Sequence, residues 1–397
     1  RKSAPHVPTP GARVRELKRH GSVPYAQIGV RRLFHVKRLH RVKGADRPSL
    51  LDIETSQIEE MIDAIIKASV RAAEAGFLAI DIIGVGGSAH SLFTSRIFND
   101  RADKWGGSAE NRIRFAVETV RGIKKTLGED FPVFYRLHGS EFLPGGYGIE
   151  GAQFNAAELE RAGVCFFNVT GGGHATSVPQ LTPNVPQGAY AHLAREVKRV
   201  LQSAVVAASN RNNHPLEAER LLRLGWADMV SLGRQSLADA DWPAKVREGR
   251  FSDVRYCIAC NECMDTAVIH NQPVRCLVNP RQGAISEVVD LPLARKKRRI
   301  AVIGAGVAGL QFALTSAERG HEVTVFERKL HVGGMWHHAS APPGREQLFS
   351  FLEWLVTQCM KANVTFKMGT EATPELLREM SFATVAVSPG SAPVESG

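Results

Sequence analysis

The sequence predicts an α/β protein in which an incomplete (β/α)8-type (TIM) barrel is followed by a partial Rossmann-like domain. Between residues 23 and 232, short apolar runs alternate with longer amphipathic segments. This alternation is typical of parallel βα units whose strands are buried on both faces. From residue 299, a new apolar run leads directly into a G-x-G-x-x-G turn. That turn indicates a second βα domain of the dinucleotide-binding kind.

The alternation up to residue 250 predicts a series of strand–helix units. In the segment 55–75, Ile58, Ile62 and Ile65 recur at helical spacing, and Ala75-Gly76 ends the pattern. The expected strands are Val23–Ile28, Phe77–Ile83, Val133–Leu137, Val164–Val169, Ala204–Ala208 and Met229–Leu232. The expected helices are 13–20, 55–75, 108–127, 151–162, 189–201, 215–224 and 239–248.

Composition excludes several classes of protein. The contents of 44% hydrophobic and 23% charged residues are ordinary for a globular chain. No run of about 18 apolar residues predicts a membrane span, and no apolar signal segment is found, so we expect a cytoplasmic protein without a membrane partner. The net charge of +10, partly in 31–43 and 295–299, favours a solvated surface or phosphate-bearing cofactors over nucleic acid. Composition leaves the oligomeric state open.

Four of the six cysteines form the pattern C-x2-C-x2-C-x12-C, at Cys257, Cys260, Cys263 and Cys276. Thiolates at such spacings can hold a [4Fe–4S] cluster or a tetrahedral zinc ion. Three cysteines in one close run favour the cluster, because structural zinc sites usually offer two separated pairs. A disulfide framework is less expected in a large chain of intracellular character. Zinc, or no metal, remains the alternative.

The glycine-rich turn after residue 299 has the features of a dinucleotide fingerprint. Gly304, Gly306 and Gly309 stand between an apolar strand and a helix over 310–319. Glu327 ends the next strand, 23 residues after Gly304, where an acidic residue binds an adenosine ribose. Gly333 and Gly334 follow at a position where FAD-type sites often continue. We therefore expect FAD on this domain, with its pyrophosphate at the helix N-terminus.

The order of these parts resembles that of a known family, the 2,4-dienoyl-CoA reductase and trimethylamine dehydrogenase group. This group is the iron–sulfur branch of the old yellow enzyme flavoproteins. The resemblance implies FMN in the barrel, a [4Fe–4S] cluster, FAD and NAD(P)H as electron donor. The segments that carry it are 99–107 (NDRADKWGG), 110–112 (ENR), 135–137 (YRL), 209–211 (SNR), 228–234 (DMVSLGR) and 276–280 (CLVNP).

The resemblance also implies roles for residues of the barrel. Arg136, expected at the C-terminal end of its strand, and Gln27 would contact the flavin pyrimidine. Four residues at the ends of the last two strands would bind the FMN phosphate, namely Asn210, Arg211, Gly233 and Arg234. His174, in the glycine-rich loop after a strand, would help to protonate the substrate. Ser88 stands where the reductases have a tyrosine acid.

These features predict three regions. They are a barrel domain over 1–250, a cluster segment and linker over 251–297, and a partial FAD domain over 298–397. Compared with the family, two strands before Gln27 and the NAD(P)H-binding part would be missing, as in a piece of a longer chain. The expected reaction is reduction of an activated C=C bond in an enoyl or enoyl-CoA-like substrate, by hydride transfer from FMN.

Two alternatives remain for the function. The first is an amine dehydrogenase-like enzyme. Ile83 and Gly86 argue against it, because that branch has tyrosine and histidine at these positions. The second is a truncated fragment without catalytic activity, which the missing strands and Ser88 favour.

Overall fold

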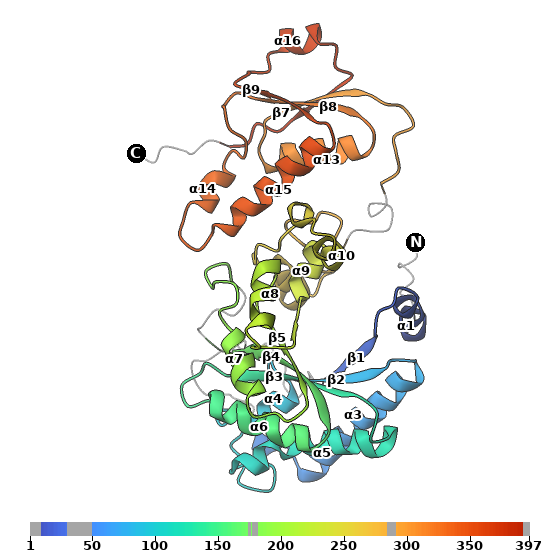
Figure 1. Cartoon of the computed structure of the whole chain (residues 1–397), viewed down its shortest axis with the longest axis vertical. Coiled ribbons are helices and arrows are strands. Elements are labelled where there is room, and N and C mark those ends of the chain that lie inside the picture. Colours follow the sequence, from blue (N-terminus) through green and yellow to red (C-terminus); the bar gives the residue numbers. More distant parts are fainter. Residues whose placement is uncertain (1–8, 30–49, 174–175, 177–181, 284–290, 392–397) are drawn as a thin grey trace. The chain divides into compact units, whose positions relative to one another are not determined.

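The chain forms two compact units, shown in Figure 1. The structure is a computed structural model that describes residues 9–29, 50–173, 176, 182–283 and 291–391. The first unit takes in most of the chain up to Ser231. The second runs from Leu232 onward and also includes Asn213–Pro215 and a short segment before Gln187. The division expected at residue 250 separates regions by function and stays a prediction.

The first unit is built on a parallel sheet of six strands among the described residues. The strands lie in the order in which they occur in the chain, so each helical crossover leads to the next strand. This is the arrangement of a (β/α)8 barrel, which needs eight such units to close. The strands are β1 (Tyr25–Ile28), β2 (Ala79–Gly84), β3 (Val133–Ser140), β4 (Val164–Gly171), β5 (Val205–Ala208) and β6 (Met229–Val230). The predicted incomplete barrel is therefore confirmed.

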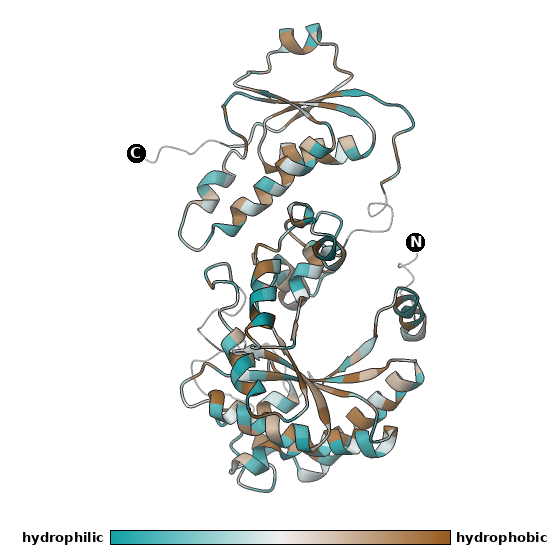
Figure 2. Ribbon diagram, viewed as in Figure 1, coloured by the Kyte–Doolittle hydropathy of each residue, from teal (hydrophilic) through white to brown (hydrophobic). Residues whose placement is uncertain are grey.

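One face of this sheet is covered by helices. Along β2, Ile80 and Ile82 are fully buried, and α3 buries Ile58, Ile62 and Ile65 on a single face. In Figure 2 the strands are largely brown, while the helices beside them carry teal residues on their outer sides. The helices of this unit are α1 (Pro10–Arg19), α3 (Thr55–Glu74), α4 (Ala89–Thr94), α5 (Ala109–Leu127), α6 (Ile149–Arg161), α7 (Ala191–Lys198) and α8 (Pro215–Arg223). A 3-10 turn, η1 (Leu50–Asp52), precedes α3.

Two short helices were not predicted. The six residues of α4 are too few to show a period, and α9 (Gly233–Ala238) is equally short. The helix predicted over 239–248 forms as the shorter α10 (Trp242–Arg247). The Asp239 carboxylate accepts hydrogen bonds from the Asp241 amide and from Lys245, and Pro243 lies in the first turn of α10. A proline is accommodated in the first turn of a helix but not in its interior, which explains why α10 starts later than predicted.

The second unit contains a parallel four-stranded sheet in the order β10–β7–β8–β9 among the described residues. Its strands are β7 (Arg299–Ile303), β8 (Glu322–Glu327), β9 (Thr365–Met368) and β10 (Thr384–Val387). Its main helices, α13 (Val307–Glu318) and α15 (Gln347–Lys361), pack together on one face (Figure 1). The shorter elements are η2 (Phe251–Asp253), α11 (Glu262–Met264), η3 (Asp265–Ile269), α14 (Trp336–Ser340) and α16 (Pro374–Glu379). This is the predicted Rossmann-like domain.

One apolar core joins the cysteine segment to this domain. Ile258 and Val278, which neighbour the cysteines, belong to the same buried cluster as Val302 of β7 and Leu355 of α15. The Trp354 indole also donates a hydrogen bond to the Asp253 carbonyl at 3.0 Å. The cysteine segment is therefore built into the dinucleotide-binding unit, where the sequence suggested a separate region.

Two smaller expectations can be compared with the structure. Cys165 and Cys359 are free cysteines, as predicted. Among the described helices, none is both long and apolar enough to cross a membrane.

Candidate functional site

Three polar side chains lie on the inner face of β1, β2 and β3. Two of them, Gln27 and Arg136, were predicted to bind the flavin, and the third is Asp81. Gln27 and Asp81 are register partners on adjacent strands, and the Gln27 amide nitrogen donates a 2.6 Å hydrogen bond to Asp81 Oδ2. Arg136 lies opposite Ile83. It shares the face of Asp81 because side chains alternate along a strand. Tyr135 points to the other face, where its ring contacts His90 of α4. Arg136 therefore faces the barrel interior.

The sequence predicted Arg136 at the C-terminal end of its strand, but in the structure it lies in the middle of β3. β3 continues to Ser140, so Arg136 is the fourth of eight residues. The strand was predicted to end at Leu137 because the sequence turns polar there, but His138 and Ser140 are buried. The flavin-binding role of Arg136 and Gln27 stays a prediction.

Asp81 carries a buried carboxyl group beside these residues. Its exposed fraction is 3%. Burial raises the pKa of Asp81 to about 6, against the lowering effects of the Gln27 hydrogen bond and the Arg136 charge. Asp81 Oδ1 has no hydrogen-bond partner among the described residues. Sequence reasoning missed this residue, although a lone carboxylate in the otherwise apolar run 79–84 was a usable signal.

The polar row continues across β4 towards β5 and the end of β6. Asn168 pairs in register with Arg136. Its amide nitrogen donates to Ser231 at 3.3 Å, and its amide oxygen accepts a hydrogen bond from Ser209. None of these three residues has a role predicted from the sequence. They give the inner face a continuous set of donors and acceptors at the C-terminal half of the strands, where barrels of this type place their active sites.

The loop after β5 is held in an unusual backbone conformation. Asn210 and Arg211 have φ angles of 69° and 61°, and the exposed fractions of both side chains are below 10%. The Asn210 amide oxygen accepts hydrogen bonds from Thr170 at 2.6 Å and from the Gly171 amide at 3.3 Å. Two consecutive non-glycine residues in the left-handed region are a cost that is often found at functional sites. This conformation is consistent with the phosphate-binding role predicted for the loop, which stays a prediction.

Of the two predicted catalytic residues, Ser88 and His174, the structure describes only Ser88. His174 lies outside the described residues. Ser88 is 2% exposed and caps the N-terminus of α4. Its hydroxyl donates to the Ile83 carbonyl at 2.6 Å and accepts from the Ser91 amide at 3.3 Å. The structure thus gives Ser88 a capping role, and its catalytic role stays a prediction.

We expect Ser88→Ala to lower the free energy of unfolding by about 1–2 kcal/mol, because it removes the cap and a buried hydrogen bond. Urea unfolding measures this loss. Ser22→Ala, at an exposed serine, is the matched control and should change stability by less than about 0.5 kcal/mol. Equal stability of Ser88→Ala and the control would contradict the capping role.

The cysteine segment is braced by side chains from α9. Gln235 is 2% exposed. Its amide oxygen accepts the Cys257 backbone N–H at 2.9 Å, and its amide nitrogen donates to the Arg255 carbonyl at 3.0 Å. Arg234, which was predicted to bind the FMN phosphate, donates to Asn261 Oδ1 at 2.8 Å within the cysteine segment. Its phosphate role, and that of Gly233 before it, stay predictions.

The four thiols of this segment act on one another electrostatically. Burial raises the pKa of Cys263, and Arg234 lowers it, while Cys257, Cys260 and Cys276 raise it further. Burial also raises the pKa of Cys260 and of Cys276. The backbone N–H groups of Glu262 and Leu277 donate hydrogen bonds to the sulfur of Cys260, and those of Val278 and Asn279 donate to the sulfur of Cys276. Amide donors directed at sulfur are a typical means of tuning iron–sulfur clusters.

Within the described ranges, no three histidine, cysteine, aspartate or glutamate side chains are grouped so as to hold a single metal ion. That finding concerns a mononuclear site. A four-iron cluster spaces its cysteine sulfurs more widely, because each sulfur binds a different iron atom.

The glycine turn of the second unit has the geometry that its sequence predicted. Gly304 has φ 100°, and a Cβ there would lie 2.2 Å from the Ser388 carbonyl oxygen. A Cβ on Gly309 would lie 2.0 Å from the Gly304 carbonyl oxygen, whereas one on Gly306 would meet nothing within 4 Å. Gly304 and Gly309 thus permit tight packing, and Gly306 leaves open space at the N-terminus of α13. These are the three roles of a dinucleotide fingerprint.

Two further parts of the fingerprint lie beside this turn. Glu327, at the end of β8, accepts the Ala305 backbone N–H at 2.9 Å through one carboxylate oxygen. Gly333 donates its N–H to the Ala305 carbonyl at 2.7 Å, and both Gly333 and Gly334 have positive φ. The predicted cofactor-binding residues of this unit therefore meet at one edge of the sheet.

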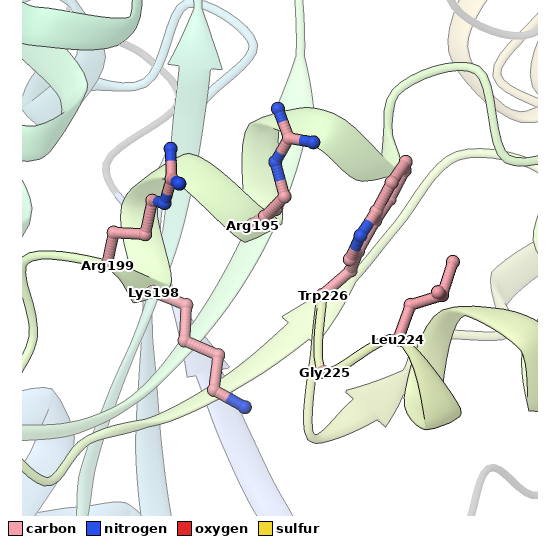
Figure 3. Close-up of a pocket in the computed structure, with 6 residues that line it drawn as sticks. All are labelled: Arg195, Lys198, Arg199, Leu224, Gly225 and Trp226. Atoms are coloured by element: carbon pink, nitrogen blue, oxygen red, sulfur yellow. The ribbon is translucent and has the colours of Figure 1, made fainter.

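A pocket of about 380 Å³ lies elsewhere in the first unit (Figure 3). It is lined by the C-terminal part of α7, by Arg199 directly after it, and by the turn Leu224-Gly225-Trp226 that follows α8. Its cations are already paired. Arg195 and Arg199 contact Glu196, and Lys198 contacts Asp228. These cations also suit the negative ends of helix dipoles. We therefore assign the pocket no anion-binding role.

The fold consists of an incomplete (β/α)8-type barrel followed by a Rossmann-like unit. The chain belongs to the NADH:flavin oxidoreductase / NADH oxidase family, whose profile matches residues 43–253, just over half of the chain. Residues 302–352 match an NAD(P)-binding Rossmann-like domain.

Individual relatives agree with this family. A metal reductase of Desulforamulus reducens is 38% identical over 349 residues, covering 87% of this chain and 52% of that protein. The N,N-dimethylglycine/sarcosine dehydrogenase of Chromohalobacter salexigens is 31% identical, covering 95% and 57%. The solved complex of 2-naphthoyl-CoA reductase with 2-naphthoyl-CoA superposes with a TM-score of 0.91 at 28% identity, covering 98% and 62%. The chain thus spans about half the length of the curated relatives it matches.

Proposed function

We propose that this chain is the FMN-, cluster- and FAD-binding part of an NAD(P)H-dependent oxidoreductase that reduces an activated C=C bond. The observation that carries the proposal is the joining of the cysteine segment to the dinucleotide-binding unit. Cys257 and Cys276 pack against the core that contains β7, α13 and α15. A cluster held there would lie next to the domain that receives electrons from NAD(P)H.

The residues of the chain fit these groups. At the barrel, Arg136 supplies an always-charged donor to the pyrimidine edge of a flavin, where reduction builds up negative charge. Gln27 supplies an amide that can both donate and accept. In the second unit, Gly306 and the N-terminus of α13 suit a pyrophosphate, and the Glu327 carboxylate suits ribose hydroxyls. When bound, FMN supplies hydride, and the cluster and FAD supply single-electron and two-electron transfer.

The substrate class rests on the residues of the barrel and on the relatives. Ile83 and Gly86 stand where the amine-oxidising branch has tyrosine and histidine, which disfavours an amine substrate. The reductase in the superposed complex binds an aromatic acyl-CoA. An amine dehydrogenase-like activity is the second candidate, because a 31% identical relative acts on methylated glycines.

The purified protein is expected to show flavin absorption. Arg136→Leu should weaken FMN binding about tenfold or more, because one half-buried charged donor is lost. Fluorescence titration of apoprotein with FMN measures this. Arg121→Leu, at an exposed position on α5, is the matched control. Substrate screening with an α,β-unsaturated acyl-CoA and a methylated amine separates the two candidates. Wild-type affinity in Arg136→Leu would overturn the flavin assignment.

A further inference from the structure

A buried carboxylate stands between the two residues that we assign to the flavin. Asp81 accepts a hydrogen bond from Gln27 on β1 and is attracted electrostatically by Arg136 on β3. Its second oxygen, Oδ1, has no hydrogen-bond partner among the described residues. Leaving such an oxygen without a donor is costly. A group held at this cost between two binding residues is a candidate for a functional part.

The chemistry of an ionised carboxylate determines how Gln27 is oriented. A carboxylate only accepts hydrogen bonds, so the Gln27 amide must turn its NH2 end towards it. The other N–H and the amide oxygen are then free to meet the donor and acceptors of a flavin pyrimidine. A protonated carboxyl group can also donate, and it would no longer select one orientation of the amide.

The same carboxylate determines the net charge next to Arg136. With Asp81 ionised, its negative charge offsets the positive charge of Arg136; with Asp81 neutral, the net charge beside Arg136 is one unit more positive. Tyr25 of β1 also interacts electrostatically with Asp81. On β2's opposite face, His90 of α4 is fully buried and its pKa is lowered to about 3, so it adds no charge near neutral pH.

We propose that Asp81 is a positioning residue that orients Gln27 and offsets the charge of Arg136, and thereby sets how strongly the site favours reduced over oxidised flavin. The inference rests on the proposed binding of FMN at Arg136 and Gln27. Reduced flavin carries negative charge at the pyrimidine, so a more positive net charge beside Arg136 stabilises it. Loss of the Asp81 charge is therefore expected to raise the midpoint potential of the bound flavin.

The test measures the midpoint potential of bound FMN between pH 5 and 8 in the wild type and in Asp81→Asn. The asparagine has nearly the same shape but no charge. We expect Asp81→Asn to favour reduced over oxidised flavin on the order of tenfold more than the wild type above pH 7. The difference should shrink below about pH 6, where burial already protonates the wild-type carboxyl group.

Two further variants make the test specific. Asp63→Asn removes an exposed acid on α3 and should follow the wild type. Gln27→Ala removes a hydrogen bond that lowers the Asp81 pKa, so the pH at which the potential changes should move upward. This shift also serves as the test if Asp81→Asn fails to fold.

The outcomes separate this inference from the proposed function. If the wild type binds FMN and Asp81→Asn has the same potential at every pH, the inference is overturned while the function stands. If the pH of the transition is unchanged in Gln27→Ala, the inference is overturned as well. If neither the wild type nor Asp63→Asn binds FMN, the proposed function fails, and this inference fails with it.

Discussion

Cys276→Ser is expected to remove the cluster almost completely. The wild type should contain about four iron atoms and about four labile sulfides per chain. Serine offers a hard hydroxyl oxygen in place of a soft thiolate, which iron–sulfur clusters prefer. Loss of one of four ligands should reduce iron and sulfide to a small fraction of the wild-type values and abolish the broad visible absorption of the cluster. Iron and sulfide assays on anaerobically purified protein measure the effect.

The control for this experiment is Cys165→Ser. Cys165 is an exposed, free cysteine in the other unit, so the same chemical change there should leave iron and sulfide unaltered. Three results would contradict the cluster. They are about one zinc ion and no sulfide in the wild type, no metal at all, or wild-type iron in Cys276→Ser. The first would restore the zinc alternative.

Gly309→Ala is expected to destabilise the second unit by roughly 2–3 kcal/mol or more. The added Cβ would stand 2.0 Å from the Gly304 carbonyl oxygen. That oxygen belongs to the backbone of the tight turn and cannot move without disturbing β7. Overpacking against backbone in a close-packed site typically costs 1–3 kcal/mol. Urea unfolding should show a lower midpoint concentration for this unit than in the wild type, and calorimetry a lower midpoint temperature.

Gly306→Ala separates stability from binding. Gly306 has φ −74° and ψ 173°, which alanine also adopts, and its added Cβ would meet nothing within 4 Å. We expect stability within about 0.5 kcal/mol of the wild type but dinucleotide affinity reduced tenfold or more, because the methyl group would occupy the place of the pyrophosphate. Unchanged FAD and NAD(P)H binding in Gly306→Ala would show that the turn is only structural.

Local patterns in the sequence were enough to predict the elements that carry these experiments. Apolar runs such as Val133–Leu137 predict buried strands because burial on both faces requires apolar side chains at every position. The spacing from Gly304 to Glu327 predicts a fingerprint because a βαβ unit has a nearly constant length. The cysteine pattern predicts a metal centre because the chemistry of thiolates at close spacing is restrictive. Each of these signals lies within some thirty residues of chain.

Contacts between distant segments were decided only by the tertiary structure. Gln27 and Asp81 are 54 residues apart and meet because β1 and β2 pair in one register. Arg234 and Asn261 are 27 residues apart and meet because α9 and the cysteine segment belong to the same unit. Ser88 caps the N-terminus of α4, a helix of only six residues, which is too short to show a hydrophobic period in the sequence.

By itself, the sequence therefore determined which chemistries the chain can hold and the order of its βα units, since both follow from short-range patterns of residue type. The tertiary structure decided which side chains share a face, which carboxylate is buried beside Arg136, and which unit includes the cysteines. The physical reason is that register, burial and the pKa of a group such as Asp81 depend on neighbours brought together by folding, and these neighbours leave no local pattern.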